Sequence, residues 1–492
     1  MSTERIKKIL QLKKRSGKKI GMIHGVFDII HAGHIFHIND ASKKVDFLIA
    51  SVTEDRFINK APGKPFFKFE NRKEVLNNIK GIDLVIKSSS KTADTNIKLI
   101  KPDIYFKGIE YKKDDITGNI IKEKKLVEKF GGVIKYTEGK VFSSSKIINE
   151  KFNYLDSDIK KFIKKINLIN FKKKIYTFKK LNKKILVIGD PIIDIYRFVD
   201  PSGKSNKASI ISTLLKYSRY YGGGALLVSN FLSDFCESID LLNLVRPNTI
   251  KKFLNKNIKL INIDTVAKPI KKIRYIDNYS GVKLFQTTNN EQTKLTDKNK
   301  KILYKKTLNL IKKYDKIFVF DFGYFSLPSE ILSLINKHQS KFIINCQSNS
   351  YNFGFNLATK YNKADIIAMD ETEFRLCLHD RDTPLKNLIL KSKKIFRNFK
   401  NVIVTSGKNG SYLIKNNKII FCPSIFKNLK DTTGSGDIFL SMYGIIKTAM
   451  NFDDEEILLL SHLAAGLHGK YYGNLIQYSQ KKIFRVAENI FK

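Results

Sequence analysis

Short apolar runs alternate with amphipathic stretches along the first 150 residues of the chain. The runs are rich in Ile, Val and Phe, so they predict buried strands, and they cover residues 19–27, 45–52, 82–88, 103–108 and 132–138. The stretches between them have helical spacing, as in FENRKEVLNNI and GNIIKEKKLVEKF. Buried strands that alternate with helices predict a parallel sheet with helices on both faces. Residues 1–150 are therefore expected to form one doubly wound α/β domain.

The rhythm breaks at residues 151–182, where lysines are dense and the helical period is loose, so this segment is expected to be a helical linker. From residue 183 to 492 the α/β pattern returns with KILVIGDPIIDIY, which begins as a strand that ends in Gly-Asp. Further strands are expected at residues 316–323, 341–346, 364–370 and 401–407. This part has a length that suits one large α/β domain.

The length of 492 residues predicts about two or three domains. The formal net charge of +44 raises the question of a nucleic-acid partner. Lysine far outnumbers arginine, however, and lysines occur in almost every segment instead of along one stripe. A nucleic-acid surface would cluster arginines with exposed aromatic residues. We interpret the charge as compositional bias with a solvated surface, and we expect no nucleic-acid partner.

Cysteine content and hydropathy indicate the compartment. The four cysteines are far apart and form no Cys-x-x-Cys pair, so neither a zinc site nor a disulfide framework is indicated. No apolar run reaches the ~18 residues that a membrane span needs, and the basic N-terminus lacks the apolar core of a signal peptide. The N-terminus predicts a short amphipathic helix instead. The protein is expected to be cytoplasmic, with no membrane partner.

The stretch GVFDIIHAGH, residues 25–34, contains the first candidate chemistry. A strand is expected to end just before Gly25, which permits a close turn of the backbone. Asp28 is placed to cap a helix that begins one or two residues later. His31 and His34 then lie at i and i+3, on one face near the helix N-terminus.

Two imidazoles beside a helix N-terminus suit a polyphosphate, because the N–H groups and the helix dipole favour anions. Gly33 adds no side chain, so a ligand can come close. The residues alone leave two other interpretations open. Histidines at helical spacing are often surface residues, and a pair at i and i+3 can hold zinc, although no third ligand is near in sequence.

The motif G-V-F-D-x-x-H-A-G-H resembles the signature of the HxGH nucleotidyltransferases, which include cytidylyltransferases and the adenylyltransferase half of bacterial ADP-heptose synthases. The resemblance extends over residues 20–150 and implies a Rossmann-like domain in which His31 and His34 are catalytic and bind the transferring phosphate. It implies that His37 lines or borders the site. It assigns nucleotide or phosphate binding to Gly25, Phe27, Asp28, Gly33, Arg72, Lys107, Gly108, Ser144 and Ser145.

The chemistry that this resemblance implies is nucleotidyl transfer. A sugar phosphate would attack the α-phosphorus of ATP or CTP, and pyrophosphate would leave. The protein must hold the two groups in line and neutralise developing charge, with Mg²⁺ as the expected cofactor. The motifs leave both ATP and CTP open as the nucleotidyl donor.

The stretch DTTGSGD, residues 431–437, contains the second candidate chemistry. Gly434, Ser435 and Gly436 offer backbone N–H groups in a tight turn before a helix, which makes an anion hole. Asp437 stands at its edge, where it can take a proton from a hydroxyl that attacks a γ-phosphate. A glycine-rich turn alone can also be a simple helix cap.

This motif resembles the ribokinase-like carbohydrate kinases, with Asp437 in the place of the catalytic base and with ATP and Mg²⁺ as the implied cofactors. The chain departs from the family pattern at Asn345-Cys346-Gln347, where an Asp-Pro is common, and at Asp370, where Asn is usual. Matches along residues 184–492 imply substrate binding by Asp194, Gly222, Gly223 and Asp321, nucleotide or phosphate binding by Ser406, Gly407, Gly434, Ser435 and Gly436, and metal binding by Asp370 and Glu373.

A sugar kinase joined to a nucleotidyltransferase resembles the bifunctional ADP-heptose synthases, with the two domains in reverse order. The favoured hypothesis is an enzyme that phosphorylates a heptose-phosphate-like sugar and then transfers a nucleotidyl group to the sugar 1-phosphate. The alternative is a nucleotidyltransferase whose kinase-like domain is catalytically weak and binds sugar or acts as a scaffold. The expected partners are a small-molecule sugar phosphate and a nucleoside triphosphate, and a homodimer is left open.

Overall fold

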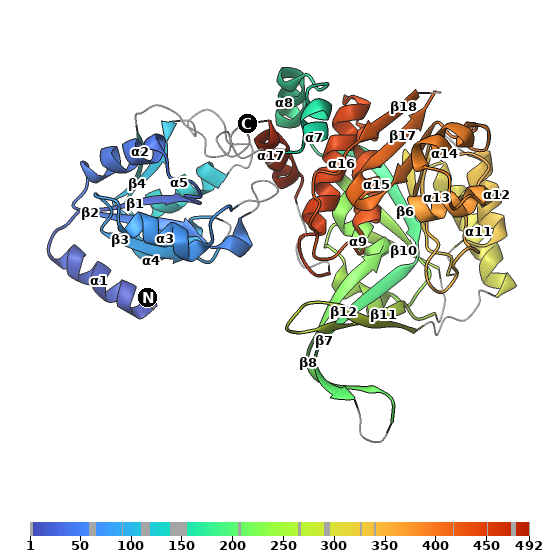
Figure 1. The fold of residues 1–492 in the computed structure, drawn as a ribbon, viewed down its shortest axis with the longest axis horizontal. Coiled ribbons are helices and arrows are strands. Elements are labelled where there is room, and N and C mark those ends of the chain that lie inside the picture. Colours follow the sequence, from blue (N-terminus) through green and yellow to red (C-terminus); the bar gives the residue numbers. More distant parts are fainter. Residues whose placement is uncertain are drawn as a thin grey trace. The chain divides into compact units, whose positions relative to one another are not determined.

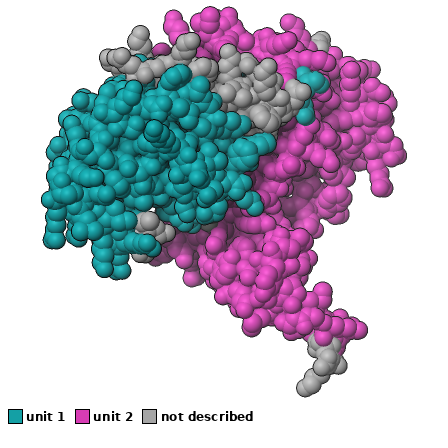
Figure 2. Space-filling model, turned by 60° about the vertical axis from the view of Figure 1, so that its left-hand side comes forward, with its two compact units in different colours: residues 1–157, 484–492 teal, residues 158–483 magenta. Residues whose placement is uncertain are grey.

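The computed structural model describes residues 3–58, 65–90, 92–109, 119–137, 155–204, 208–263, 267–289, 296–324, 327–338, 341–416, 418–449, 451–473 and 479–491. The chain divides into two compact units, residues 1–157 with 484–492 (unit 1) and residues 158–483 (unit 2). Figure 1 shows the helices and strands of both units, and Figure 2 colours the two units separately. Each unit is described by itself.

Unit 1 is built on a five-stranded parallel sheet in the order β3-β2-β1-β4-β5. Its strands are β1 (Ile20–Gly25), β2 (Phe47–Thr53), β3 (Leu84–Ser88), β4 (Ile104–Gly108) and β5 (Val133–Thr137). Four of these strands lie within their predicted apolar runs, and β2 extends one residue beyond its run, so the strand prediction is confirmed here. The strand order reverses between β1 and β4, and open α/β sheets bind ligands outside the carboxyl ends of their strands at such a point.

Helices cover both faces of this sheet. Met22 of β1 belongs to one apolar core, which also contains Ile6 of the N-terminal helix. Ile23, the next residue, belongs to the core on the opposite face. The predicted amphipathic helix at the N-terminus is therefore confirmed. The helices of unit 1 are α1 (Thr3–Arg15), α2 (Ala32–Ser42), α3 (Phe69–Asn77), α4 (Asp94–Ile100) and α5 (Asn119–Lys129).

Unit 2 contains a nine-stranded sheet in the order β10-β9-β6-β13-β14-β15-β16-β17-β18. The strands are parallel as far as β16, after which β17 and β18 continue antiparallel. The strands predicted from apolar runs are confirmed as β6, β13, β14, β15 and β16. The bounds are β6 (Leu181–Gly189), β9 (Cys236–Asn243), β10 (Ile258–Asn262), β13 (Lys316–Asp321), β14 (Phe342–Cys346), β15 (Ile366–Asp370), β16 (Asn401–Thr405), β17 (Ser411–Lys415) and β18 (Lys418–Cys422).

A second sheet of four strands, here called the small sheet, projects from the nine-stranded sheet (Figure 1). Its order is β12-β11-β7-β8, with β7 (Pro191–Lys204), β8 (Ile211–Gly224), β11 (Ile270–Asp277) and β12 (Lys283–Asn289). Only Asp190 separates β7 from the end of β6. The sequence analysis did not predict the small sheet, because its strands mix lysine, arginine and tyrosine with apolar residues.

The predicted helical linker contains two helices in its described part, α7 (Ser157–Ile163) and α8 (Leu168–Thr177). Lys174 of α8 pairs with the buried carboxylate of Glu456 at 2.7 Å, so this ion pair holds α8 within unit 2. The remaining helices are α9 (Ala225–Leu232), α10 (Pro247–Ile250), α11 (Asp297–Ile311), α12 (Ser329–Lys337), α13 (Glu371–Leu378), α14 (Leu385–Lys391), α15 (Ser435–Thr448), α16 (Asp454–His468) and α17 (Gln480–Ile490).

Candidate functional site

The glycine-rich turn of unit 2 leads into α15, as the sequence predicted. Gly434 is the N-cap residue and has a φ of 77°, a left-handed conformation that glycine adopts without strain. A Cβ on Gly434 would also come within 2.7 Å of Leu227 Cδ2. Ser435 and Gly436 start the first turn, whose N–H groups have no intrahelical acceptor. The turn therefore presents a helix N-terminus suited to an anion.

Asp437 lies in the same first turn, and its side chain is buried. Asn345 Nδ2 and Gln347 Nε2 both donate to Asp437 Oδ1 at 2.7 Å. Burial raises the pKa of Asp437 to about 7, against the opposing effects of Lys272 and the two amides. A carboxyl group with a pKa near neutrality can accept a proton at physiological pH. The geometry therefore fits the predicted role of a catalytic base.

Asp194 lies on β7 and forms a buried ion pair with Arg274 of β11. Lys272, two residues before Arg274, is the register partner of Asp194. Its ammonium lies 5.4 Å from the centroid of the Tyr324 ring, and burial lowers the pKa of Lys272. Lys272 interacts electrostatically with both Asp194 and Asp437. The sequence analysis missed both cations, although their spacing of two on a strand was a usable signal.

Gly222 and Gly223, predicted to bind substrate, come just before Gly224, the last residue of β8, and lie opposite the start of β7. A Cβ on Gly223 would lie 2.0 Å from Asp194 Oδ2, whereas one on Gly222 would lie 3.1 Å from Leu226 Cβ. The missing side chain at residue 223 is thus what lets the Asp194 carboxylate occupy its place.

Replacing Gly223 by Ala is expected to lower kcat/KM for the sugar by about 10- to 100-fold, because the new methyl group must displace the Asp194 carboxylate. Steady-state kinetics at varied sugar and at varied ATP measure this effect. The KM for ATP serves as the internal control and should stay within about twofold, given that ATP is expected to bind at the other edge of the site. An unchanged kcat/KM for sugar would contradict the role given to Asp194.

Asp431, the first residue of the motif, has a role that the sequence analysis did not assign. Its buried carboxylate accepts hydrogen bonds from Tyr196 Oη and Lys283 Nζ, both at 2.6 Å. The N–H of Gly473 donates to it at 2.9 Å, and Lys283 Nζ also donates to Thr433 Oγ1 at 2.9 Å. Burial opposes ionisation, but these hydrogen bonds hold the pKa of Asp431 well below its usual range. Asp431 therefore ties β7 and β12 of the small sheet to the glycine-rich turn.

Asp321, predicted to bind substrate, ends β13 inside a buried polar network. Tyr361 Oη donates to its Oδ2 at 2.7 Å, and Lys360 forms an ion pair with the same oxygen. The N–H of Gly323 donates to Oδ1 at 3.0 Å. These bonds hold the loop that follows β13. The contact with substrate stays a prediction.

Asp370 and Glu373, predicted to bind metal, form a capping box at the start of α13. The N–H of Glu373 donates to Asp370 Oδ1 at 2.8 Å, and the N–H of Asp370 donates to Glu373 Oε2 at 2.7 Å. Burial and the neighbouring Asp370 raise the pKa of Glu373 to about 8. Within the described part of the chain, no group of three or more His, Cys, Asp or Glu side chains could hold a metal ion.

Mg²⁺ usually keeps several waters and uses one or two carboxylates together with substrate phosphates. The pair formed by Asp370 and Glu373 therefore fits an ion that arrives with the nucleotide, and it does not form a permanent metal cage. Both residues also lie beside the predicted nucleotide site. Asp370 ends β15 and is the register partner of Thr405, directly before Ser406.

Ser406 and Gly407, predicted to bind nucleotide, form the turn between β16 and β17. Ser406 Oγ donates to a carboxylate oxygen of Glu371, and the N–H of Ser406 donates to the carbonyl of Gly410 at 2.8 Å. Gly407 has a φ of 49°, which glycine tolerates. The structure thus brings the predicted nucleotide and metal residues to one edge of the nine-stranded sheet.

In unit 1 the first residue of α2 is Ala32, and His31 is its N-cap residue. The helix therefore starts later than predicted. The rings of His31 and His34 stack with centroids 4.0 Å apart, and the ring of Phe27 lies 5.5 Å from that of His34. Phe27 has a φ of 50°, and a Cβ on Gly25 would meet its ring at 3.1 Å. The predicted catalytic pair is thus assembled outside the carboxyl end of β1.

The expectation that Asp28 caps α2 is wrong. Its carboxylate accepts hydrogen bonds from the backbone N–H groups of Phe66 and Phe67, at 2.7 and 2.9 Å, just before α3. Among the described residues no side-chain hydrogen bond caps α2. The first turn of α2, which includes Gly33, therefore keeps N–H groups that an anion can use.

Arg72, predicted to contact phosphate, is fully buried in α3. Its guanidinium donates to the carbonyls of Phe67 at 3.0 Å, Thr53 at 2.8 Å and Val26. It also pairs with Asp55 Oδ1 at 2.6 Å. Through these hydrogen bonds Arg72 connects α3 to the carboxyl ends of β1 and β2. Its contact with phosphate stays a prediction.

Lys107 and Gly108 end β4, which neighbours β1 across the point where the strand order reverses. Lys107 Nζ pairs with Glu123 Oε2 at 2.9 Å. Tyr105 Oη donates to the same oxygen at 3.1 Å. The positions of both residues at this crevice fit the predicted nucleotide site.

His37 Nδ1 forms a hydrogen bond of 2.6 Å with Thr137 Oγ1. Burial, with a contribution from Lys107, lowers the pKa of His37 to about 4, so its ring is neutral at pH 7. A neutral imidazole in this place fits a residue at the border of the site. Ser144 and Ser145, also predicted to bind phosphate, lie outside the described residues.

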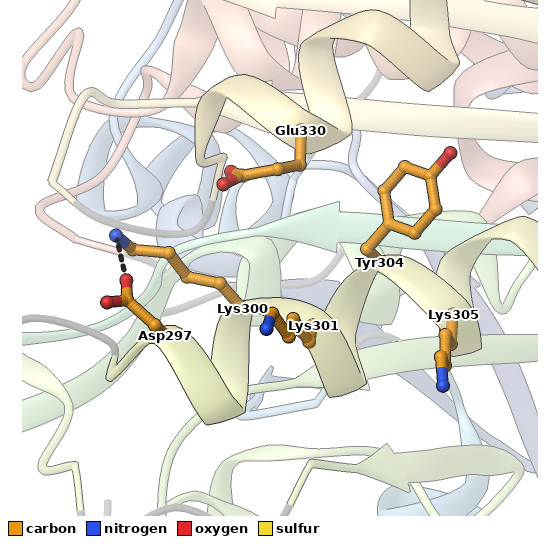
Figure 3. Close-up of a pocket in the computed structure, with 6 residues that line it drawn as sticks. All are labelled: Asp297, Lys300, Lys301, Tyr304, Lys305 and Glu330. Atoms are coloured by element: carbon orange, nitrogen blue, oxygen red, sulfur yellow. Dashed lines mark hydrogen bonds and ion pairs between the residues drawn. The ribbon is translucent and has the colours of Figure 1, made fainter.

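A surface pocket of about 400 Å³ lies beside α11 and α12 (Figure 3). Asp297 and Lys300 form an ion pair of 2.9 Å at its edge. No residue with a predicted chemical role lines it, so we place no reaction there. The residues that line it are Asp297, Lys300, Lys301, Tyr304, Lys305 and Glu330.

The five-stranded and nine-stranded sheets, each with a glycine-containing turn before a helix, define an α/β protein with two candidate phosphate sites. Residues 182–473 match the family model described as pfkB family carbohydrate kinase, and residues 22–150 match the cytidylyltransferase-like family. The chain belongs to the pfkB family of carbohydrate kinases, with a cytidylyltransferase-like segment before the kinase segment. The fold class and the domain combination predicted from the sequence are confirmed.

Curated relatives match a smaller part of the chain. The Bifunctional protein HldE of Desulfatibacillum aliphaticivorans is 31% identical over 150 residues, 30% of this chain and 30% of that protein. The Bifunctional protein HldE of Vibrio vulnificus (strain YJ016) is 37% identical over 121 residues, 24% of each chain. The matched part thus spans less than a third of the length of these relatives.

Among solved structures, phosphofructokinase-2 from Escherichia coli in complex with substrates and products matches with a TM-score of 0.51 and 12% identity, over 62% of this chain and 98% of that chain. This likeness shows the fold of unit 2. Enzymes of the two matched families generally use ATP and Mg²⁺ and bind sugar phosphates and nucleotides. Among the described helices, none combines the length and the apolar character needed to cross a membrane.

Proposed function

We propose that the chain is a bifunctional enzyme that phosphorylates a heptose-phosphate-like sugar with ATP and then transfers a nucleotidyl group from ATP or CTP to the sugar 1-phosphate. The observation that carries the proposal is Asp437. This buried carboxyl stands at the first turn of α15, next to a glycine-rich anion hole and near the ion pair of Asp194 and Arg274. This arrangement suits the transfer of a phosphoryl group to a sugar hydroxyl.

In the kinase step, the sugar hydroxyl loses its proton to Asp437, and its oxygen attacks the γ-phosphorus of ATP. The bond between that phosphorus and the bridging oxygen breaks, and ADP leaves. The N–H of Gly436, in the first turn of α15, stabilises the charge that develops on the transferring group. Mg²⁺, held near Asp370 and Glu373 with the phosphates, would supply further charge neutralisation when bound.

In the transferase step, a phosphate oxygen of the sugar 1-phosphate attacks the α-phosphorus of the nucleotide, and pyrophosphate leaves. His31 and His34 can donate hydrogen bonds to the α-phosphate at the N-terminus of α2. Lys107 and Gly108 lie at the neighbouring strand end, where the rest of the nucleotide would bind. Ser144 and Ser145 are proposed to bind the same nucleotide.

The residues around Asp194 support a phosphorylated sugar as the kinase substrate. Lys272 and Arg274 bring two cations to the sugar side of the site, and a neutral sugar would not need both. We assign the transferase to residues 1–150, a helical linker to residues 151–182 and the kinase to residues 183–492. The enzyme is proposed to work in the cytoplasm.

We also propose that the chain forms a homodimer through the small sheet. Its strands β8 and β12 expose several large apolar side chains, and patches of this kind often mark interfaces.

Replacing Leu215 by Asp is expected to convert a dimer to a monomer at about 10 µM, because a charge would be buried at the interface. Sedimentation velocity measures this change. A wild-type chain that sediments as a monomer would contradict the proposal. The exposed side chains include Ile211, Leu214, Leu215, Tyr217, Tyr220 and Phe285.

The test of the bifunctional proposal is a product-mass assay. Purified protein would receive Mg²⁺, ATP or CTP, and a panel of heptose and hexose phosphates. A sugar bisphosphate followed by a nucleotide sugar and pyrophosphate would support both steps and name the base. A nucleotide sugar formed only from a supplied sugar 1-phosphate would favour a catalytically weak, sugar-binding kinase domain.

A further inference from the structure

We propose that Asn345 and Gln347 are positioning residues that hold Asp437 by its Oδ1 atom, so that Oδ2 is the atom that takes the proton from the sugar. The inference rests on the proposed kinase function. It explains the place where the chain departs from the common Asp-Pro of its family, since this departure supplies the two amides.

The two amides reach Asp437 from one strand. Asn345 lies within β14 and Gln347 directly follows it, so the two side chains leave the backbone on the same side. Both nitrogens lie 2.7 Å from Oδ1 of Asp437. No hydrogen bond to Oδ2 comes from any of the described residues. The two oxygens of the carboxylate are therefore not equivalent, because one is held and the other is available.

The backbone of Gln347 is fixed on both sides. Its N–H donates to the carbonyl of Asp321 at 2.9 Å, and its carbonyl accepts from Asn356 Nδ2 at 2.9 Å. The next residue, Ser348, donates its N–H to Glu373 Oε1 at 2.9 Å. The Gln347 side chain is thus presented from a backbone that is tied to both the sugar side and the nucleotide side of the site.

Neutral donors suit a general base better than a directly paired cation would. A hydrogen bond to the charged form of a carboxyl lowers its pKa, and a bonded Lys or Arg would lower it much further and weaken the base. Charged groups around Asp437 are Lys272 of β11, Asp194 of β7 and Glu373 of α13, and His468 of α16 lies near the adjacent Gly434. None of these is hydrogen-bonded to its carboxylate in the described structure. The amide pair therefore orients Asp437 and opposes the rise in its pKa that burial causes.

The proton and the electrons then follow one path. The O–H bond of the sugar hydroxyl breaks, and its proton moves to Oδ2 of Asp437. The electron pair left on the sugar oxygen forms the new bond to the γ-phosphorus, and the bond from that phosphorus to ADP breaks. The held oxygen, Oδ1, keeps its two amide bonds throughout.

The experiment compares the full-length wild type with Gln347→Leu, Gln347→Glu and the matched control Gln11→Leu. Gln11 lies exposed on α1 of unit 1, outside the kinase unit that contains Asp437. Two readouts are recorded from pH 5.5 to 9.5, namely kcat for sugar phosphorylation and the ¹³C shift of the Asp437 carboxyl. The carboxyl signal is assigned by its loss in Asp437→Asn.

Losing one hydrogen bond to the charged form is expected to raise the pKa of Asp437 by about one pH unit in Gln347→Leu. At pH 6.5 kcat then falls about tenfold, and it recovers above about pH 8.5. Gln347→Glu raises the pKa of Asp437 further, since it places a second carboxyl beside the first, and Gln11→Leu leaves both readouts unchanged.

A loss of kcat that is equal at every pH, with an unchanged carboxyl titration, would show a merely structural role and overturn the inference. An unchanged profile in both Gln347 variants would do the same. If the wild type phosphorylates no sugar, the proposed function fails. The carboxyl titration then decides the positioning role alone, since it needs no turnover.

Discussion

Replacing Asp437 by Asn is expected to lower kcat for sugar phosphorylation by about 10³-fold, which is within the range that a general base contributes. Asn keeps the size of the side chain and an oxygen for the amides of Asn345 and Gln347, so the turn before α15 should stay intact. The substitution removes only the ability of this side chain to take a proton from the sugar hydroxyl. Coupled ADP release at saturating sugar and ATP measures the rate.

The pH dependence gives this prediction a second check. Asp437 must be deprotonated to act, and its pKa is raised to about 7, so the wild-type kcat should fall about tenfold per pH unit below that value. The residual rate of Asp437→Asn should lack this limb. As a control, nucleotidyl transfer from a supplied sugar 1-phosphate should be unchanged. A variant that keeps wild-type kinase activity would remove Asp437 from the mechanism.

The same substitution should stabilise unit 2 at high pH. The folded-state pKa of Asp437 lies above its unfolded value, so the native state binds this proton more tightly. This bound proton stabilises the folded state fully at low pH. The stabilisation is lost as the pH rises through about 7, because a buried charge must then form on Asp437. Asp437→Asn should therefore raise the melting temperature more at pH 8 than at pH 5.

The second large effect is expected in unit 1, where replacing His31 or His34 by Ala should lower kcat for nucleotidyl transfer by about 10²- to 10³-fold. The two rings stack at the start of α2, where the backbone N–H groups already favour an anion. Each imidazole can add one hydrogen bond to the charge that develops on the α-phosphate. Pyrophosphate release from ATP or CTP with a sugar 1-phosphate measures the effect.

The matched control is His338→Ala, which removes a histidine that lies at the end of α12 in unit 2. It should leave both activities unchanged, and the two unit 1 variants should leave the kinase activity unchanged. The double variant should lose little more than the worse single one, because the two rings act on one group. Normal transfer by both single variants would show that these histidines serve the fold or the surface only.

Most of the strands that were predicted, such as β2, β13 and β14, are buried on both faces and therefore read as continuous apolar runs. The edge strands β10 and β18 are partly exposed and were not predicted. The small sheet could not be predicted in this way. Its strand IKKIRYID has Lys272 and Arg274 among apolar residues, which suggests a surface segment until the partner strand β7 is known. A charged side chain inside a site and one in solvent look the same in a sequence.

The candidate site was predictable where a motif is local and not where distant segments meet. Asp437 was found in its motif, but its partners Asn345 and Gln347 lie 92 and 90 residues earlier in the chain. Arg72 shows the opposite limit. It lies in FENRKEVLNNI, whose spacing predicted a helix, but neither spacing nor motif reveals that the guanidinium turns inward to three backbone carbonyls.

The single residue between β6 and β7 has a mechanical consequence. If the small sheet moves relative to the nine-stranded sheet, the connection from β6 to β7 must bend at Gly189 and Asp190, because the ring of Pro191 restricts its own φ. On the return strand, Gly224 has a φ of 54° and no room for a Cβ beside the carbonyl of Asp190. A movement of the small sheet would therefore carry Asp194 of β7 with it, and the hydrogen bonds of Tyr196 and Lys283 to Asp431 would oppose that movement.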